Sequence, residues 1–266
     1  MHHFVEVLVN INNSILPHPI NEIVNGIGFG VNLTKNSQLW KNMQISGLLH
    51  IVVLSGANIV LLVAFLDKIL YFVKRKPRSL VILICIIFYV YLCGASPSLI
   101  RAMIMGIITQ FSILIGRRSY SAVSLLFAFI IMWIVDPSNL SDLSFILSFS
   151  ACLGIVLFKD DIESFLKRTR LGEVKSEIAL SISAQVLVVP LIFWFYSTIS
   201  LASTIATLLV FPVIVPIMIM AWILPIIHQW TPEMAMILTW FTYYLGQWVY
   251  LIATFIGESR FLFIKI

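Results

Sequence analysis

Long apolar stretches dominate this chain and limit what it can fold into. A helix that crosses a bilayer needs about 20 mostly apolar residues, because the hydrocarbon core is roughly 30 Å thick. Hydrophobic residues make up 60% of the 266 residues and charged residues only 11%, against about 45–50% and 25% in soluble domains. The sequence therefore predicts an all-α polytopic integral membrane protein, and it excludes an ordinary soluble enzyme or a disordered chain.

The apolar stretches leave room for about eight transmembrane segments, some of them broken or kinked. Residues 1–45 are mixed in composition and are predicted to form an extracytoplasmic or interfacial lead-in with one short helix, and residues 46–266 the transmembrane domain. The predicted segments are 46–73, 79–94, 97–115, 120–135, 140–158, 177–195, 200–228 and 234–256.

Prolines interrupt two of these segments. Pro190 is predicted to break the sixth segment near its middle. The seventh segment carries Pro212, Pro216 and Pro225, and its 29 residues are too many for one straight crossing. It is therefore predicted to be two short pieces or one strongly kinked helix.

Basic residues fall on alternate connections between the segments. Twelve of the 17 Lys and Arg residues lie within 68–78, 117–118 and 159–175, and the intervening connections carry none. Lys and Arg are concentrated in the cytoplasmic loops of membrane proteins. These three loops are therefore predicted to be cytoplasmic, and residues 1–45 to lie outside.

Polar residues inside a membrane segment are costly, so each is a candidate functional residue. The first segment carries His50 and Asn58, and its Ser55-Gly56 pair permits local unwinding of the helix. The third segment carries Arg101, which is the only charge well within a segment. Gln185 belongs to a polar stripe on the sixth segment.

The predicted topology places His50, Arg101, Asp136 and Asp142 in the outer half of the membrane, and they are predicted to form one polar mouth. Arg101 is expected to pair with Asp142 or Asp136. Asp142 is preferred, because it lies in the first turn of the fifth segment, where the helix N-terminus stabilises a negative charge. The alternative is that Arg101 extends its charge to the membrane surface without a partner.

Three motifs in this order and spacing resemble the ComEC-type competence proteins. They are Ser46-Gly47…His50…Ser55-Gly56-Ala57-Asn58, then Arg101-Ala102…Met105, then Asp136-Pro137…Asp142…Phe145…Leu147-Ser148-Phe149…Gly154. The resemblance implies a multi-pass channel in the bacterial cytoplasmic membrane that passes single-stranded DNA into the cell during natural transformation. The residues expected to line the DNA path and its mouth are His50, Ser55, Gly56, Asn58, Arg101, Asp136, Asp142 and Gln185.

Fuller members of this family carry an OB-like domain before the membrane core and a metallo-β-lactamase-like domain after it. This sequence shows neither, so it is expected to be the membrane core alone, with no enzymatic activity, cofactor or metal. It has no P-loop, and the expected partners are therefore the bilayer, the DNA and other competence proteins, including a separate ATPase and a DNA receptor. A separately encoded nuclease-like domain is a further candidate partner.

Three other functions compete with a DNA channel. A small-solute or ion transporter built on broken helices fits the Ser55-Gly56 and Pro212–Pro216 interruptions equally well. A degenerate relative that transports nothing is a second alternative. An intramembrane serine protease using Ser55 and His50 is disfavoured, because five residues place them about 140° apart around a helix.

The predicted orientation is tested by single cysteines introduced into the connections. Asn36→Cys and Asn139→Cys should react with an impermeant thiol reagent added to intact cells, and Lys76→Cys and Arg170→Cys should not, because the positive-inside rule puts them in the cytoplasm. Labelling of Arg170→Cys from outside would overturn the orientation.

Overall fold

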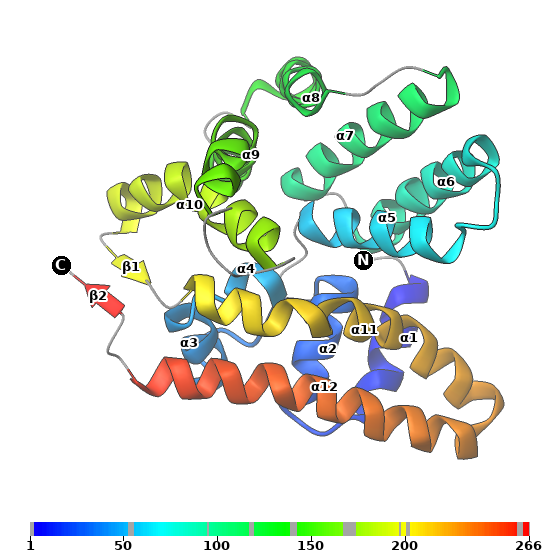
Figure 1. Ribbon diagram of the computed structural model, residues 1–266. Coiled ribbons are helices and arrows are strands. Elements are labelled where there is room, and N and C mark those ends of the chain that lie inside the picture. Colours follow the sequence, from blue (N-terminus) through cyan, green and yellow to red (C-terminus); the bar gives the residue numbers. More distant parts are fainter. Residues whose placement is uncertain are drawn as a thin grey trace. The chain divides into compact units, whose positions relative to one another are not determined.

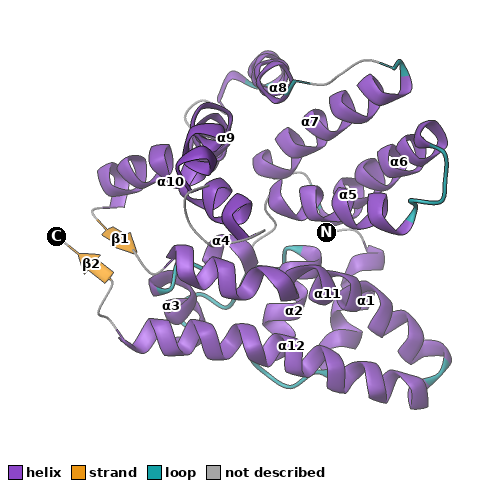
Figure 2. Cartoon of the chain, in the orientation of Figure 1, coloured by secondary structure: helices purple, strands orange, loops and turns teal. Residues whose placement is uncertain are grey.

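The computed structural model describes residues 3–52, 56–94, 96–116, 120–138, 143–166, 174–196, 198–200, 203–259 and 263–265. Within these ranges the chain is almost entirely helical, as Figures 1 and 2 show, and the predicted helical class is confirmed. Two three-residue strands, β1 (Thr198–Ser200) and β2 (Phe263–Lys265), pair with each other. The helices are α1 (His3–Ile15), α2 (Ile20–Phe29), α3 (Gln38–Ile45), α4 (Leu49–Val52), α5 (Gly56–Ile69), α6 (Arg75–Cys93), α7 (Pro97–Leu114), α8 (Ser121–Val135), α9 (Leu143–Leu166), α10 (Val174–Tyr196), α11 (Ser203–Trp230) and α12 (Pro232–Ser259).

Two of these helices are long and apolar enough to cross a membrane by length and composition, Arg75–Cys93 and Ile205–Trp230. Shorter apolar helices cover Ser98–Leu114, Ser121–Val135 and Ile178–Trp194. The predicted segments 79–94, 97–115 and 120–135 therefore coincide with α6, α7 and α8 to within about one helical turn. The count of eight crossings stays a prediction.

Local chemistry explains why α7 begins where it does. The Ser96 side chain accepts a hydrogen bond from the backbone N–H of Leu99, and Pro97 occupies the first helical turn, as the sequence predicts. Serine at this position satisfies a backbone donor that has no helical partner, and proline has no N–H to leave unpaired. This start fixes which residues of α7 face its neighbours, including Arg101 one turn later.

The prediction that Pro190 breaks its segment was wrong, because Pro190 lies inside α10 and does not end it. The helix α11 is continuous over 28 residues and contains Pro212, Pro216 and Pro225, so of the two predicted alternatives the two short pieces are excluded and the kinked helix stays a prediction. Proline removes one backbone hydrogen bond, and a helix continues past it where neighbours supply partners for the carbonyl that loses its donor. Within the first predicted segment the structure describes α4 up to Val52 and α5 from Gly56.

The chain divides into two compact units. Unit 1 consists of Met1–Asn58, Tyr91–Gly94 and Ser200–Phe263, and unit 2 of Ile59–Val90, Ala95–Ile199 and Ile264–Ile266. Unit 1 therefore joins the first helices of the chain to the last two.

In unit 1, α11 and α12 lie side by side, and α1, α2 and α3 pack on them (Figure 1). The prediction of one short helix in residues 1–45 was wrong, because this segment forms three helices. Most of α2 is buried, and its buried apolar residues are Ile20, Ile23, Val24, Ile27 and Phe29. Asn and Gly residues gave the segment the composition of a surface stretch, although the structure uses them for packing.

Two glycines of α2 permit the close packing of unit 1. A Cβ atom on Gly26 would lie 2.5 Å from a methyl carbon of Val52 and 2.7 Å from its carbonyl oxygen. A Cβ atom on Gly28 would overlap the methyl group of Ala221 in α11. Any larger side chain at these positions would push α2 away from α4 or α11.

Asn12 of α1 replaces a hydrogen bond that Pro225 removes from α11. Pro225 has no N–H, so the carbonyl of Ala221, four residues earlier, has no helical donor. The Asn12 side-chain amide donates to this carbonyl at 3.0 Å and to the Asn25 side-chain oxygen of α2 at 3.0 Å. One fully buried asparagine therefore joins α1, α2 and α11.

Unit 2 is built on α9 and α10, which pack along each other, with α7 and α8 against α9. Gly154 of α9 allows this approach, because a Cβ there would overlap the carbonyl oxygen of Ser183 in α10. At the other side of α7, the buried Ser79 hydroxyl of α6 donates to the Gln110 side-chain oxygen at 2.7 Å. Unit 2 thus holds Arg101 between α7 and α9.

The role of Pro225 predicts a rescue between two distant positions. Asn12→Leu leaves the Ala221 carbonyl buried without a donor and should cost about 1–3 kcal/mol of stability. Adding Pro225→Ala restores a backbone N–H to that carbonyl, so the double variant should recover part of this loss. Thermal unfolding of the detergent-purified protein measures both effects. Pro212→Ala is the matched control and should rescue nothing, and strictly additive effects of Asn12→Leu and Pro225→Ala would contradict the assignment.

Candidate functional site

Arg101 is held between α7 and α9 in unit 2. Only 7% of the residue is exposed, and Nη1 donates to both the carbonyl and the hydroxyl oxygen of Ser148. The guanidinium carbon also lies 5.8 Å from the centre of the Phe149 ring, close enough for a cation–π interaction. Arg101 therefore lies inside the helical unit and does not extend to its surface.

The guanidinium is only partly satisfied by these contacts. Arg101 Nε is buried and has no hydrogen-bond partner among the described residues. A central arginine in a membrane helix costs about 2.5–3.5 kcal/mol on insertion scales, and an unpaired buried donor adds to that cost. A cation kept in this state has spare capacity to bind an anion.

The structure describes only one of the two aspartates that were predicted as partners of Arg101. Asp142 lies outside the described residues. Asp136 ends α8, is exposed, and accepts hydrogen bonds from the hydroxyl of Ser138 at 2.6 Å and from its backbone N–H at 3.0 Å. These bonds stabilise the carboxylate and lower the pKa of Asp136, so it stays ionised at a more acidic pH than an ordinary aspartate. An ion pair of Arg101 with either aspartate stays a prediction.

Asn58 has a capping role in unit 1. It is 1% exposed, and its side-chain amide donates to the carbonyl of Ile27 at 3.2 Å. Ile27 lies in the last turn of α2, where carbonyl groups have no helical donor. In the same turn the Trp222 indole N–H donates to the Gly28 carbonyl at 3.2 Å. The backbone N–H of Gly30 donates to the Gly26 carbonyl, and Gly30 has a φ of 74°. Asn58 thus completes the C-terminal end of α2.

The other predicted path residues are distributed over both units. Gly56 is the first residue of α5 and is buried, and Gln185 is half-buried in α10. His50 lies in α4, and its side chain and all of Ser55 are outside the description. His50 belongs to unit 1, and Arg101, Asp136 and Gln185 belong to unit 2. The single mouth predicted from the sequence stays a prediction.

Polar groups that sequence reasoning missed form a chain of asparagine amides in unit 1. Asn25 donates to the Asn13 side-chain oxygen at 2.9 Å, and Asn21 donates to the same oxygen at 3.1 Å, in addition to the Asn12–Asn25 bond. The signal in the sequence was five asparagines within two short apolar helices, four of which form this chain. Ser148 was also missed as a partner of Arg101, because its spacing with Ser141, Ser144 and Ala151 is typical of residues that let helices pack closely.

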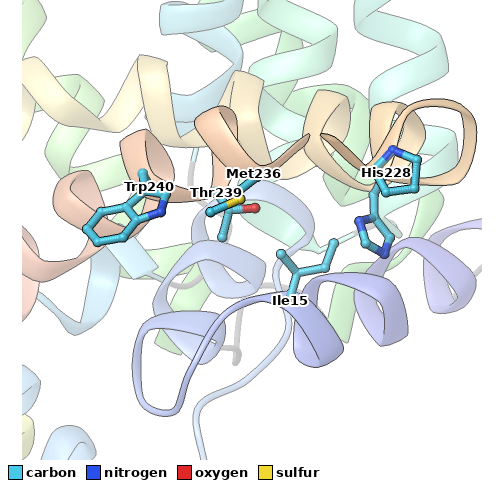
Figure 3. Close-up of a pocket in the computed structure, with 6 residues that line it drawn as sticks. Ile15, His228, Met236, Thr239 and Trp240 are labelled. Atoms are coloured by element: carbon cyan, nitrogen blue, oxygen red, sulfur yellow. The ribbon is translucent and has the colours of Figure 1, made fainter. Parts of the chain in front are cut away.

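The described residues offer no group of three His, Cys, Asp or Glu side chains placed to bind a metal. An open depression of about 240 Å³ lies in unit 1 where α11 turns into α12, and it is lined by Ile15, His228, Pro232, Met236, Thr239 and Trp240. Figure 3 shows Ile15 of α1 between His228 and Thr239. None of the residues predicted for the DNA path lines it.

A helical, mostly apolar chain has the features of a membrane protein, and an arginine buried among its helices marks a candidate functional site. A family model described as "Competence protein" matches residues 27–265, so the chain belongs to the competence protein family. This confirms the resemblance seen in the motifs. Membership and the apolar helices together indicate a membrane location and a role in competence.

Among named proteins, the chain is similar to ComE operon protein 3 of Bacillus subtilis (strain 168), with 25% identity over 207 residues. The alignment covers 77% of this chain and 26% of the relative, so the chain spans about a quarter of that protein's length. No solved structure matches.

The Arg101–Ser148 contact predicts a specific loss of stability. Ser148→Ala removes the hydroxyl acceptor and leaves the carbonyl, so it should cost about 1 kcal/mol in thermal unfolding of the purified protein. Ser150→Ala is the matched control, because two residues along α9 turn the side chain about 200° away. Equal effects of the two variants would contradict the contact.

Proposed function

We propose that this chain forms a channel that passes single-stranded DNA across the bacterial cytoplasmic membrane during natural transformation. The observation that carries the proposal is the family match, which runs from residue 27 to residue 265 and therefore includes all three sequence motifs. The similarity to ComE operon protein 3 covers 207 residues and points in the same direction.

Arg101 gives the proposal a physical basis. A DNA strand is a polyanion, and its passage requires cationic or hydrogen-bonding groups along a hydrated path. Arg101 is buried, its hydrogen-bonded partners among the described residues are the two oxygens of Ser148, and its Nε is unpaired. A phosphodiester at this position would supply the missing acceptor through a charge-assisted hydrogen bond. His50, Ser55, Gly56, Asn58, Asp136, Asp142 and Gln185 remain the other proposed residues of the path and its mouth.

Other proteins would supply what this channel needs. The sequence contains no phosphate-binding loop of the P-loop type, so we assign ATP hydrolysis to a separate ATPase and capture of DNA to a separate receptor. A separately encoded nuclease-like domain is a further proposed partner.

A small-solute or ion transporter is the second candidate function, and it can be compared with the backbone carbonyls of α11. Transporters of this kind place their sites at unwound, proline-containing helices whose free carbonyls bind ions. In α11 the helix is continuous, and the Ala221 carbonyl that Pro225 leaves free accepts a bond from Asn12. This carbonyl is therefore occupied by a structural contact and offers no ion site, whereas the Ser55-Gly56 and Pro212–Pro216 interruptions still fit a transporter as the alternative.

Uptake of labelled DNA by a deletion strain that expresses this chain tests the proposal. The unsubstituted chain should restore entry of labelled DNA. Arg101→Lys should lower uptake about tenfold, because lysine loses the planar geometry that holds Ser148 and a phosphate together. Lys41→Gln, an exposed charge in α3, is the control and should have no effect.

Protein level in membrane extracts must be equal for all variants. Absence of uptake with a normal level of the unsubstituted protein would contradict the proposal and favour a non-transporting relative. Uptake at the unsubstituted rate in Arg101→Lys would remove Arg101 from the path.

A further inference from the structure

Two adjacent aromatic rings are exposed in the connection between α5 and α6. Tyr71 is 78% exposed and Phe72 is 71% exposed, and their ring centres lie 6.0 Å apart at an angle of 85°. This connection is described without gaps and is drawn as a loop in Figure 2. Large exposed aromatic side chains on a short loop suggest a partner that stacks on or packs against them.

A run of cations follows the two rings. Lys74, Arg75 and Lys76 are exposed, and α6 begins at Arg75 with no acidic residue in its first turn. The N-terminal end of a helix carries a partial positive charge, so cations there destabilise the helix. No described carboxylate pairs with these three residues. Their position is therefore unfavourable for the helix itself and suits an external anion.

Neighbouring contacts hold this loop in place. Arg78 Nε forms an ion pair with the Asp67 carboxylate at 3.1 Å, which ties the start of α6 to the end of α5. One turn into α6, Ser79 donates to the side chain of Gln110 in α7. Gln110 lies nine residues after Arg101 in the sequence, about 14 Å along the helix axis. The loop is thus fixed to one end of the helix whose other end carries Arg101.

We propose that Tyr71, Phe72, Lys74, Arg75 and Lys76 form a binding surface for single-stranded DNA at the cytoplasmic end of the channel. We call these five residues the exit surface. The proposal rests on the proposed function and on the predicted orientation, which puts residues 68–78 in the cytoplasm. Proteins bind single strands without sequence preference by stacking bases on aromatic rings and placing cations near the phosphates. The exit surface has both components within six residues.

An anionic membrane surface is the competing ligand, because aromatic and basic residues also gather at the cytoplasmic leaflet. The link through Ser79 and Gln110 favours DNA. It holds the exit surface near the end of α7 that is remote from Arg101, where a strand moving along α7 would emerge, whereas a lipid contact requires no such position. A strand leaving the channel would meet the rings and cations first.

The test measures binding of a fluorescent single-stranded oligonucleotide to the full chain in nanodiscs of zwitterionic lipid, which removes anionic lipid as a ligand. Tyr71→Ala with Phe72→Ala should weaken binding about tenfold without changing its salt dependence. Lys74→Gln, Arg75→Gln and Lys76→Gln together should reduce the slope of log K against log salt by about 2, at roughly 0.7 per phosphate contact. Phe165→Ala, another exposed aromatic of unit 2, is the matched control and should bind normally.

Normal binding by both sets of variants would overturn the exit surface. So would variants that bind the oligonucleotide normally and lose binding only to vesicles with anionic lipid, since the residues would then contact the membrane. Failure of the unsubstituted chain to restore uptake in cells contradicts the proposed function itself. Restored uptake that the exit-surface variants leave unchanged contradicts the exit surface alone.

Discussion

Backbone carbonyls that lack a helical donor must find one elsewhere when they are buried among apolar residues. Unit 1 depends on this constraint. The last turn of α2 leaves carbonyls without partners, and Asn58 and the indole N–H of Trp222 bind two of them. Pro225 leaves the Ala221 carbonyl without a donor, and Asn12 binds it. Three helices from the two ends of the sequence, α1, α2 and α11, and the unit 1 residue Asn58 are thereby held to one another.

The sequence predicts features that arise from neighbouring residues. The start of α7 follows from Ser96 and Pro97, and the ends of α6 and α8 follow from the limits of their apolar stretches. It does not reveal features that depend on distant residues. Asn12 and Ala221 are 209 residues apart in the sequence, so nothing near Asn12 indicates that its amide replaces a bond lost at Pro225. For the same reason residues 1–45 were predicted as a lead-in with one helix, although three helices pack there.

The candidate site also combines a feature that the sequence reveals with one that only the structure reveals. Arg101 stands out in the sequence because it is a single charge within an apolar segment, and its burial follows from that position. The identity of its hydrogen-bond partner does not follow from the sequence. Aspartates are predicted at a similar depth in the membrane, and Ser148 has the spacing of a residue that packs between helices. The structure gives the polar residues two kinds of role. Asn58 and Asn12 satisfy backbone carbonyls in unit 1, whereas Arg101 retains an unpaired buried donor in unit 2. The unpaired donor of Arg101 leaves capacity for an anionic ligand, whereas the Asn12 side-chain oxygen, also buried without a partner among the described residues, is an acceptor and cannot bind an anion.

The central claim is that a DNA strand passes along the Arg101 side of α7, and cross-linking tests it most directly. A photoreactive residue at Ser98 or Thr109 lies within about 80° of Arg101 around α7, and one at Met103 lies on the opposite side, about 160° away. A labelled single strand with a bulky trailing end would be stalled during uptake and then irradiated. The account predicts that positions 98 and 109 capture the strand and that position 103 does not. Equal capture at all three positions, or capture at 103 alone, would contradict it.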